Sequence, residues 1–252
     1  MIRDHTNAKK ALIAISLIAV CVISGILANY KETGVFLTTN RKLPIYSVDT
    51  KEKKVAITFD ASWGEDKTDK IIKILDKYQV KATFFLVGAW VDLHPDKLKL
   101  LYEDGQEIGN HSTRHPDMTQ ISNAKMVEEI SINDNKIAAI TGQTPKLFRC
   151  PSGAYNNSVI ETVESTNHYC IQWDVDSIDW KGHGADIEYN RVISKTKPGS
   201  IILFHCDAIN TPDNLPRIIE KLKEEGYFFV KVSDLIYKNN YHIDSAGKQI
   251  SN

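Results

Sequence analysis

Reactive side chains follow apolar, strand-like stretches of this 252-residue sequence, each at the point where a stretch ends. They are Asp60, His111, Arg149, Asp176 and His205. Barrels built from alternating strands and helices place their catalytic groups at the carboxyl ends of successive buried strands. The pattern therefore predicts an enzyme rather than a structural protein.

Two histidines, His111 and His115, are four residues apart and are followed by Pro116. Imidazole is the commonest protein ligand for zinc-like metals. The pair can bind one ion if the segment turns after its strand. The alternative is a pair of hydrogen-bonded structural histidines.

Asp60, Arg149 and His205 have the side chains of an acid–base site. Asp60 ends a buried stretch, so its carboxylate either faces a site or caps the next helix. Arg149 needs a carboxylate partner if it is buried, and Asp60 is the expected one; a surface salt bridge is the alternative. His205 is suited to proton transfer near neutral pH, or else is a structural histidine.

Aromatic and acidic residues occur together between Trp173 and Trp180, with Asp176 and Asp179 in the same segment. Exposed aromatic rings beside carboxylates suit sugars, which present apolar faces and hydroxyl edges. The alternative is that both tryptophans belong to the core.

The segments that must position these residues alternate between strand-like and helix-like patterns from Lys53 onward. This alternation predicts an α/β fold with a parallel sheet, open or closed. The expected strands are 55–59, 82–87, 107–110, 147–149, 169–173, 200–204 and 227–231, and the expected helices are 66–78, 95–104, 123–141, 157–166, 186–196 and 213–225. A polar connector, 31–52, precedes them, and we expect the polar tail, 238–252, to be loosely held.

The first thirty residues form a separate segment. Residues 11–28 are almost unbroken apolar, near the length that crosses a bilayer, and they follow Arg3, Lys9 and Lys10. We expect residues 1–30 to anchor the chain in the cell membrane as a single span, with the rest outside. A cleaved signal peptide and a secreted protein are the alternative.

The net charge and the cysteines indicate which partners and which disulfides to expect. The formal net charge is −1, so we expect no nucleic acid partner. Cys150 and Cys206 adjoin Arg149 and His205, which places them near one another if the site forms. We interpret both as small packing residues rather than as a disulfide.

Five short motifs occur in the order in which one known family carries them. They are Thr58-Phe-Asp60, His111-Ser-Thr-Arg-His115, Arg149-Cys-Pro151, Asp176-Ser-Ile-Asp-Trp180 and Leu203-Phe-His205. Over residues 53–237 the chain resembles the polysaccharide deacetylases of the NodB-homology type, carbohydrate esterase family 4. The stretch from Thr58 to Gly64, behind an apolar N-terminal segment, is most similar to the PdaB-like sporulation branch of that family.

The resemblance implies a deformed (β/α) barrel and a metal-dependent hydrolase. The reaction would remove N-acetyl groups from the amino sugars of a cell-wall polysaccharide, with spore-related peptidoglycan as the expected substrate. His111 and His115 would hold a divalent metal, zinc or alternatively cobalt or another transition metal. Asp60 would be the general base, and Arg149 would hold it in place.

The remaining site residues take their roles from the same resemblance. His205 would protonate the leaving amine, and Asp176 would orient it and stabilise its charge. The backbone N–H of Ser152 would stabilise the oxyanion. The expected substrate-binding residues are Ser152, Trp180, Leu203 and Trp63.

One residue departs from the family pattern. The family carries two aspartates in its first motif, and the second binds the metal, but this chain has Ala61 at that position. Loss of one anionic ligand should weaken metal binding unless Glu65 or Asp66 replaces it.

Three hypotheses of function follow. The first is an active N-deacetylase of peptidoglycan or a related glycan. The second is a catalytically degenerate envelope protein that binds glycan without turnover, which Ala61 motivates. The third is a metal hydrolase that acts on another amide or on an ester.

Overall fold

The computed structural model describes residues 41–63 and 67–252, and residues 41–252 form one compact unit. The predicted membrane anchor lies outside the described residues, as do Glu65 and Asp66. None of the helices in the described ranges is long and apolar enough to cross a bilayer.

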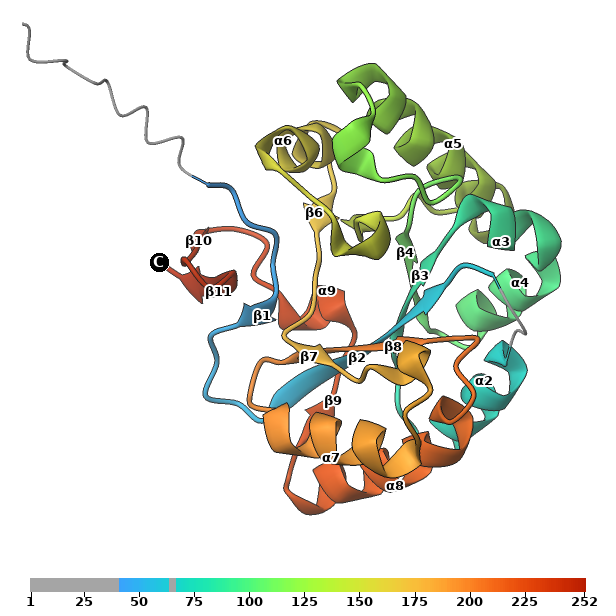
Figure 1. The fold of residues 1–252 in the computed structure, drawn as a ribbon, viewed down its shortest axis with the longest axis vertical. Helices are drawn as coiled ribbons and strands as arrows, with labels where there is room; N and C mark the ends of the chain where they lie inside the picture. The colour runs from blue at the N-terminus through green and yellow to red at the C-terminus, as the bar shows by residue number, and fades with distance from the viewer. Residues whose placement is uncertain (1–40, 64–66) are drawn as a thin grey trace, which may run out of the picture. The chain divides into compact units, whose positions relative to one another are not determined.

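A parallel sheet of short strands forms the centre of this unit (Figure 1). Its strands are β2 (Lys54–Ala61), β3 (Thr83–Leu86), β4 (Glu107–Asn110), β5 (Leu147–Phe148), β6 (Tyr169–Cys170), β7 (Val175–Asp176), β8 (Ile201–His205) and β9 (Phe228–Phe229). The order is β6-β5-β4-β3-β2-β8-β7, with β9 paired to the start of β2. No described pairing joins β6 to β7, so the sheet is an open half-barrel, as in a deformed barrel that does not close.

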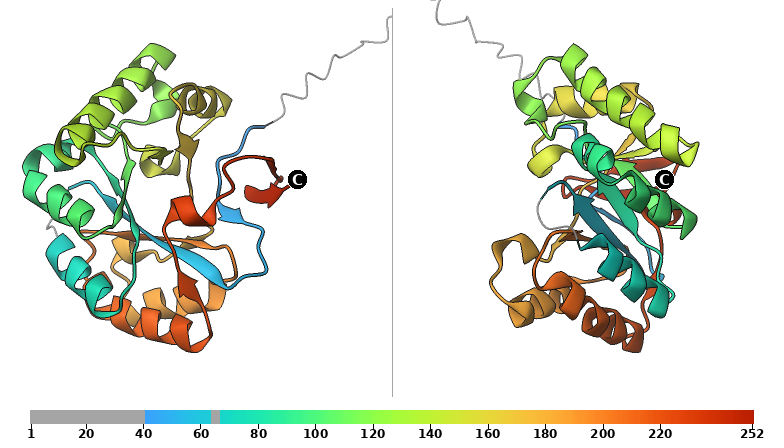
Figure 2. Two further views of the ribbon diagram at one scale, coloured as in Figure 1. Left: turned by 180° about the vertical axis from the view of Figure 1, so that it is seen from behind. Right: turned by 90° about the vertical axis from the view of Figure 1, so that its right-hand side faces the viewer.

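Helices cover the outside of this half-barrel, as the two views of Figure 2 show. They are α2 (Thr68–Lys77), α3 (Gly88–Leu93), α4 (Pro95–Glu103), α5 (Asn123–Thr141), α6 (Asn157–Ser165), α7 (Ala185–Lys195) and α8 (Thr211–Glu224), while the short α9 (Val232–Leu235) lies at the amino-terminal end of the sheet, where Val232 N–H donates to Thr83 Oγ1. The sequence pattern predicted each of these except α3 and α9, which have only six and four residues.

Strand β2 is buried along seven of its eight residues. Strands of a parallel sheet are usually covered by other elements on both faces, which explains this continuous burial. Its Phe59 ring stacks between Phe84 and Phe204, at centroid distances of 4.9 and 5.7 Å. The register places Asp60 beside His205 of β8. Strand pairing alone therefore brings together two chemical groups that are 145 residues apart.

The two ends of the described chain pair with one another, which corrects our expectation of a loosely held tail. Strands β10 (Tyr241–Ile243) and β11 (Lys248–Ser251) form a hairpin, and β1 (Ser47–Val48) adds to β11 in parallel. Buried Gln249 exchanges two hydrogen bonds with the backbone of Tyr237. Backbone and amide hydrogen bonds therefore hold this polar tail, together with the packing of Ile243 against the core.

The described cysteines are free and buried, as packing residues should be. The Sγ atom of Cys150 lies 3.6 Å from that of Cys170.

Candidate active site

Asp60 and Arg149 form a buried ion pair at the carboxyl end of the sheet. Asp60 is 5% exposed and Arg149 is fully buried, and Nη1 of the arginine donates to Oδ1 of the aspartate at 2.7 Å. The guanidinium lies 4.1 Å from the centroid of the Phe85 ring, and a Cβ on Gly109 would clash with that ring at 2.5 Å. The glycine therefore leaves room for the aromatic support of Arg149.

The charge of Asp60 is fixed by its neighbours. Burial alone would raise the pKa of this carboxyl, but the positive charge of Arg149, with electrostatic help from the His111 and His205 rings, holds the pKa below its ordinary value. Asp60 is therefore ionised at neutral pH and able to accept a proton.

His111 is oriented by the segment that carries the arginine. Its Nδ1 lies 2.8 Å from the backbone oxygen of Arg149, so Nδ1 carries the proton and Nε2 keeps its lone pair. That Nε2 faces Oδ2 of Asp60 at 3.5 Å. A second partner of this kind is what orients metal-ligating histidines in proteins.

The loop from His111 to His115 is held in a strained conformation by hydrogen bonds from its backbone to nearby side chains. Ser112 and His115 have positive φ angles of 67° and 59°. Ser112 N–H donates to Asn110 Oδ1 at 2.8 Å, and Ser112 Oγ accepts from His115 N–H at 2.9 Å. Glu129 of α5 accepts from the backbone N–H groups of Thr113 and Arg114, at 3.1 and 2.8 Å. The two rings end 4.8 Å apart, centroid to centroid.

Both imidazoles are in the form that binds metal. Burial lowers the pKa of His111, and burial followed by the electrostatic effect of the neighbouring His111 ring lowers the pKa of His115 to about 4. Two neutral imidazoles beside a carboxylate suit a zinc-like ion. Ala61 is buried and contributes no ligand, and the described residues contain no group of three acidic, histidine or cysteine side chains arranged around one ion. The donor set therefore fits a divalent metal held by two protein ligands.

His205 is held by Asp179, which corrects our expectation that Asp176 would hold it. Asp179 Oδ1 lies 2.8 Å from His205 Nδ1, and Oδ2 accepts from the backbone N–H of His205 at 2.7 Å. Asp176 instead accepts from the backbone N–H of Ile178 at 2.7 Å, in a tight turn two residues on. That turn, with Ile178 at φ 56°, carries Asp179 rather than Asp176 beneath the histidine.

Asp179 keeps His205 protonated. Burial alone would lower the pKa of the imidazole, but the hydrogen bond and charge of Asp179, with further help from Asp60 and Asp207, raise the pKa to about 9. Asp207 also lines the cavity that contains His205.

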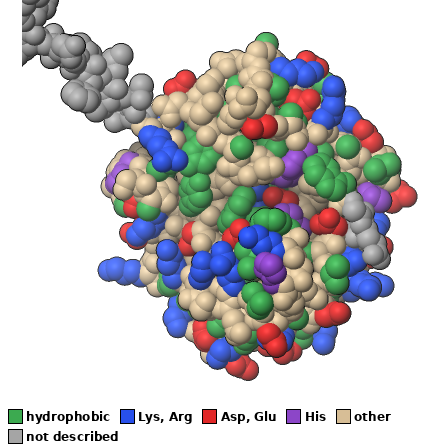
Figure 3. Space-filling model, in the orientation of Figure 1, with side chains coloured by type: hydrophobic (Ala, Val, Ile, Leu, Met, Phe, Trp, Pro, Cys, Tyr) green, Lys and Arg blue, Asp and Glu red, His purple; other side chains and the backbone are tan. Residues whose placement is uncertain are grey.

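A cavity of about 510 Å³ joins these groups. All the predicted site residues line it except Arg149, which lies behind Asp60. Trp63 and Trp180 are 62% and 60% exposed, while Trp173 is half-buried against Arg149. Figure 3 shows histidine and acidic side chains together in a hollow near the middle of this face. The exposed rings fit the sugar-binding interpretation of the tryptophans.

Ser152 sits at the rim of this cavity in a left-handed conformation, φ 55° and ψ 15°. Such a conformation costs about 1 kcal/mol or more for a residue with a Cβ. Among the described residues nothing accepts a hydrogen bond from its backbone N–H. The N–H is therefore available to a ligand.

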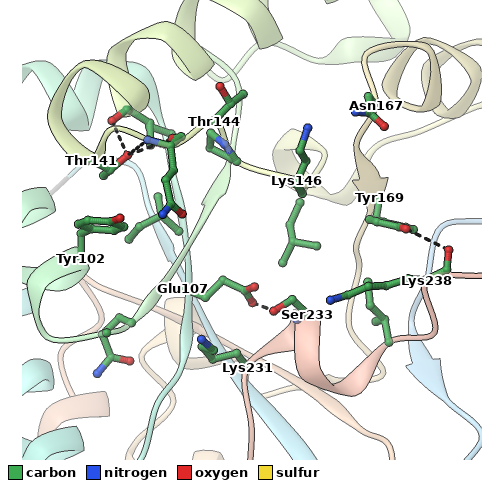
Figure 4. A pocket seen from close by; sticks show the side chains of 18 of the residues that line it. Tyr102, Glu107, Thr141, Thr144, Lys146, Asn167, Tyr169, Lys231, Ser233 and Lys238 are labelled. Atoms are coloured by element: carbon green, nitrogen blue, oxygen red, sulfur yellow. Dashed lines mark hydrogen bonds between the residues drawn. The ribbon is translucent and has the colours of Figure 1, made fainter.

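A larger cavity, about 890 Å³, lies at the opposite ends of β4, β5 and β6 (Figure 4). Glu107 accepts there from the backbone N–H of Ser233 at 3.1 Å, and Lys146, Lys231 and Lys238 line the walls. No motif residue contributes to this cavity. The motif residues therefore gather at the smaller cavity and not at this one.

Comparison with known proteins agrees with this geometry. The family model described as polysaccharide deacetylase matches residues 47–171. Peptidoglycan-N-acetylmuramic acid deacetylase PdaA of Bacillus subtilis is 30% identical over 204 residues, 79% of this chain and 78% of that protein.

The chain belongs to the polysaccharide deacetylase family. An uncharacterised Bacillus subtilis protein, YlxY, is 35% identical over 81% of this chain, and the match spans 64% of YlxY, less than two thirds of its length. The crystal structure of PdaA, a family 4 carbohydrate esterase, superposes with a TM-score of 0.72 at 30% identity, covering 76% of this chain and 84% of PdaA. The resemblance drawn from the motifs is thereby confirmed.

The family also contains similar proteins without activity. The structure of a wild-type pseudoenzyme from Bacillus anthracis superposes with a TM-score of 0.73 at 36% identity, over 76% of this chain and 68% of that one. A mutant of that pseudoenzyme is described as having restored enzymatic activity. Membership in the polysaccharide deacetylase family therefore does not by itself establish turnover.

Proposed function

We propose that this protein is a hydrolase that removes N-acetyl groups from amino sugars of peptidoglycan. The observation that carries the proposal is the pairing of Asp60 with His205 on adjacent strands at one cavity. Their pKa values are displaced in opposite directions, one below and one above the ordinary value. At neutral pH one group is therefore a base and the other an acid.

The chain's own residues divide the reaction between them. Asp60, ionised and held by Arg149, takes a proton from the water that attacks the acetamide carbonyl. The backbone N–H of Ser152 donates to the oxygen that becomes negative in the transition state. His205, protonated and held by Asp179, gives its proton to the leaving amine nitrogen. Acetate and a free amino sugar result.

We further propose that the enzyme depends on a divalent metal, zinc or alternatively cobalt, held by His111 and His115. When bound, the ion would supply Lewis-acid polarisation of the acetamide carbonyl. Because Ala61 stands where the family has a ligand, we expect weaker binding than in relatives that keep it.

The choice of peptidoglycan rests on the relatives and on the two exposed tryptophans. PdaA is named for N-acetylmuramic acid, and a Bacillus cereus relative, 33% identical over 93% of its length, for N-acetylglucosamine. The test is mass spectrometry of peptidoglycan fragments after incubation with the purified protein. Loss of one acetyl group from muramic acid or from glucosamine identifies the sugar, and unchanged fragments with added zinc contradict the proposal.

A second candidate is a glycan-binding envelope protein without turnover. Ala61 and the similar pseudoenzyme favour it. Its signature would be co-sedimentation with insoluble peptidoglycan that survives His205→Ala and is accompanied by no acetate release. A metal hydrolase acting on esters is separated from both by a chromogenic acetate ester assayed beside the glycan.

The cellular setting is proposed from the sequence alone. We propose a single membrane span at residues 11–28 with the catalytic domain outside, and a place in sporulation from the PdaB-like motif at Thr58. Protease treatment of intact cells tests the first, since an external domain is degraded while cytoplasmic proteins are not. Analysis of spore peptidoglycan from a deletion strain tests the second.

A further inference from the structure

A buried hydroxyl joins the Asp179 carboxylate to a second carboxyl group deeper in the protein. Thr211, the first residue of α8, is fully buried. Its Oγ1 lies 2.9 Å from Asp179 Oδ2 and 3.3 Å from Oε1 of Glu188, a residue of α7 that is 2% exposed. Packing of α7 beside α8, visible in Figure 1, brings the three groups together.

The single hydroxyl proton of Thr211 limits which of its two contacts can be hydrogen bonds. A threonine hydroxyl has one proton, so it can donate to only one of two ionised carboxylates. Asp179 Oδ2 is the nearer acceptor, and Asp179 must stay ionised to hold protonated His205. For the Glu188 contact also to be a hydrogen bond, Glu188 must be the donor, which requires a carboxylic acid there.

The surroundings of Glu188 favour the same form. Its Oε2 has no hydrogen-bond partner among the described residues, and an unpaired buried oxygen is far less unfavourable in a neutral acid than in an anion. Two charged groups act on it, Asp179 from the segment before α7 and Arg217 from α8. Burial and then the Asp179 charge raise the pKa of Glu188 to about 7, although the side chains of Asn214 and Thr211 and the charge of Arg217 act in the opposite direction.

We propose that Glu188 is a positioning residue that stays protonated and donates a hydrogen bond to Thr211, which in turn donates its own hydrogen bond to Asp179, so that one hydrogen-bond chain leads from the interior to His205. This inference rests on the proposed function, in which His205 is the acid. The hydrogen-bond chain holds the Asp179 carboxylate in the orientation that meets His205. When Glu188 loses its proton, a second negative charge stands behind Asp179, and His205 becomes a weaker acid.

The test is a titration of the full chain in detergent, with metal removed by a chelator and no substrate present. Carbon-13 labels at the glutamate carboxyls and nitrogen-15 labels at the histidines report each group by NMR. We expect one glutamate signal, absent in Glu188→Gln, to titrate with a midpoint near 7. A midpoint near the ordinary value of about 4.3 would overturn the proposal.

The Glu188→Gln variant gives the second reading, because glutamine is neutral and still donates to Thr211. In wild type, Glu188 is ionised over the pH range in which His205 titrates, and its charge raises the pKa of His205. The pKa of His205 should therefore be about 1 pH unit lower in this variant, the effect of a unit charge roughly 10 Å away at an effective dielectric of about 20. The control is Asp213→Asn, which removes an exposed carboxylate near Thr211 and should leave the His205 curve unchanged. Identical His205 curves for wild type and Glu188→Gln would overturn the proposal, and the wild-type glutamate titration decides it if the variant does not fold.

The pH profile of acetate release adds a reading that a purely structural role would not change. The rate should fall above pH 7 in wild type and fall less in Glu188→Gln. If no acetate is released at any pH, the proposed function fails while the NMR titration still decides the state of Glu188.

Discussion

Replacing Arg149 with methionine should invert the pH dependence that Asp60 gives to stability. The pair is buried, with 2.7 Å between Nη1 and Oδ1. Unit charges about 4 Å apart attract by about 4 kcal/mol at an effective dielectric near 20, and breaking a buried pair destabilises by about 3–5 kcal/mol. Methionine keeps much of the side-chain volume, so the lost charge dominates.

The sign follows from linkage. In wild type the folded pKa of Asp60 is below the unfolded value, so its stabilisation is present above the unfolded pKa of about 3.9 and is lost as pH falls through the folded pKa. In Arg149→Met the buried carboxyl loses the largest charge that lowers its pKa and keeps that of His205, so burial raises its folded pKa. Its contribution then becomes more unfavourable as pH rises above about 4.

The assay is urea unfolding of wild type, Arg149→Met, Asp60→Asn and the double variant at pH values from 4 to 7.5. The free energy of unfolding lost on removing Arg149 should grow with pH when Asp60 is present, reaching about 3–5 kcal/mol at neutral pH. In the Asp60→Asn background, where no acid titrates at this position, the loss should be constant with pH. A loss independent of pH in both backgrounds would refute the reasoning, since packing rather than charge would then explain it.

Three further predictions concern the site. Ala61→Asp should tighten zinc binding at least about 10-fold, as measured by calorimetry, because mutation of residues that only support a metal ligand already changes affinity by about that much. Unchanged affinity would show that this position does not face the ion. Asp179→Asn should lower the pKa of His205 from about 9 and reduce acetate release about 100-fold or more, whereas Asp176→Asn should do much less; equal losses would restore Asp176 as the partner. Trp180→Ala should weaken glycan binding by about 1 kcal/mol, roughly fivefold, with kcat nearly unchanged, and a large fall in kcat would contradict a sugar-stacking role.

Much of the site was predictable from sequence because strand ends converge in a parallel sheet. Asp60, His111, Arg149 and His205 each follow an apolar stretch, and parallel register brings those ends to one edge. The expected pairing of Arg149 with Asp60 was found because buried charges of opposite sign must be paired.

What the sequence did not reveal depends on turn geometry and on distant packing. Both Asp176 and Asp179 lie in the motif, and only the left-handed turn at Ile178 decides which one reaches His205. Glu188 lies on a helix whose pattern gives no sign of a polar contact, and its role appears only when α8 places Thr211 beside it. A sequence signal for Asp179 did exist, because Asp179 directly precedes Trp180, which was a predicted site residue. The structure places that tryptophan in the lining of the cavity.

The central claim is that Asp60 and His205 form a working acid–base pair although Ala61 replaces a ligand. The most direct measurement is acetate release from peptidoglycan by the purified protein, metal-free and with added zinc, beside the Asp60→Asn variant. We predict zinc-dependent release in wild type and none in the variant. Absence of release with zinc, or equal release from the variant, would contradict the claim.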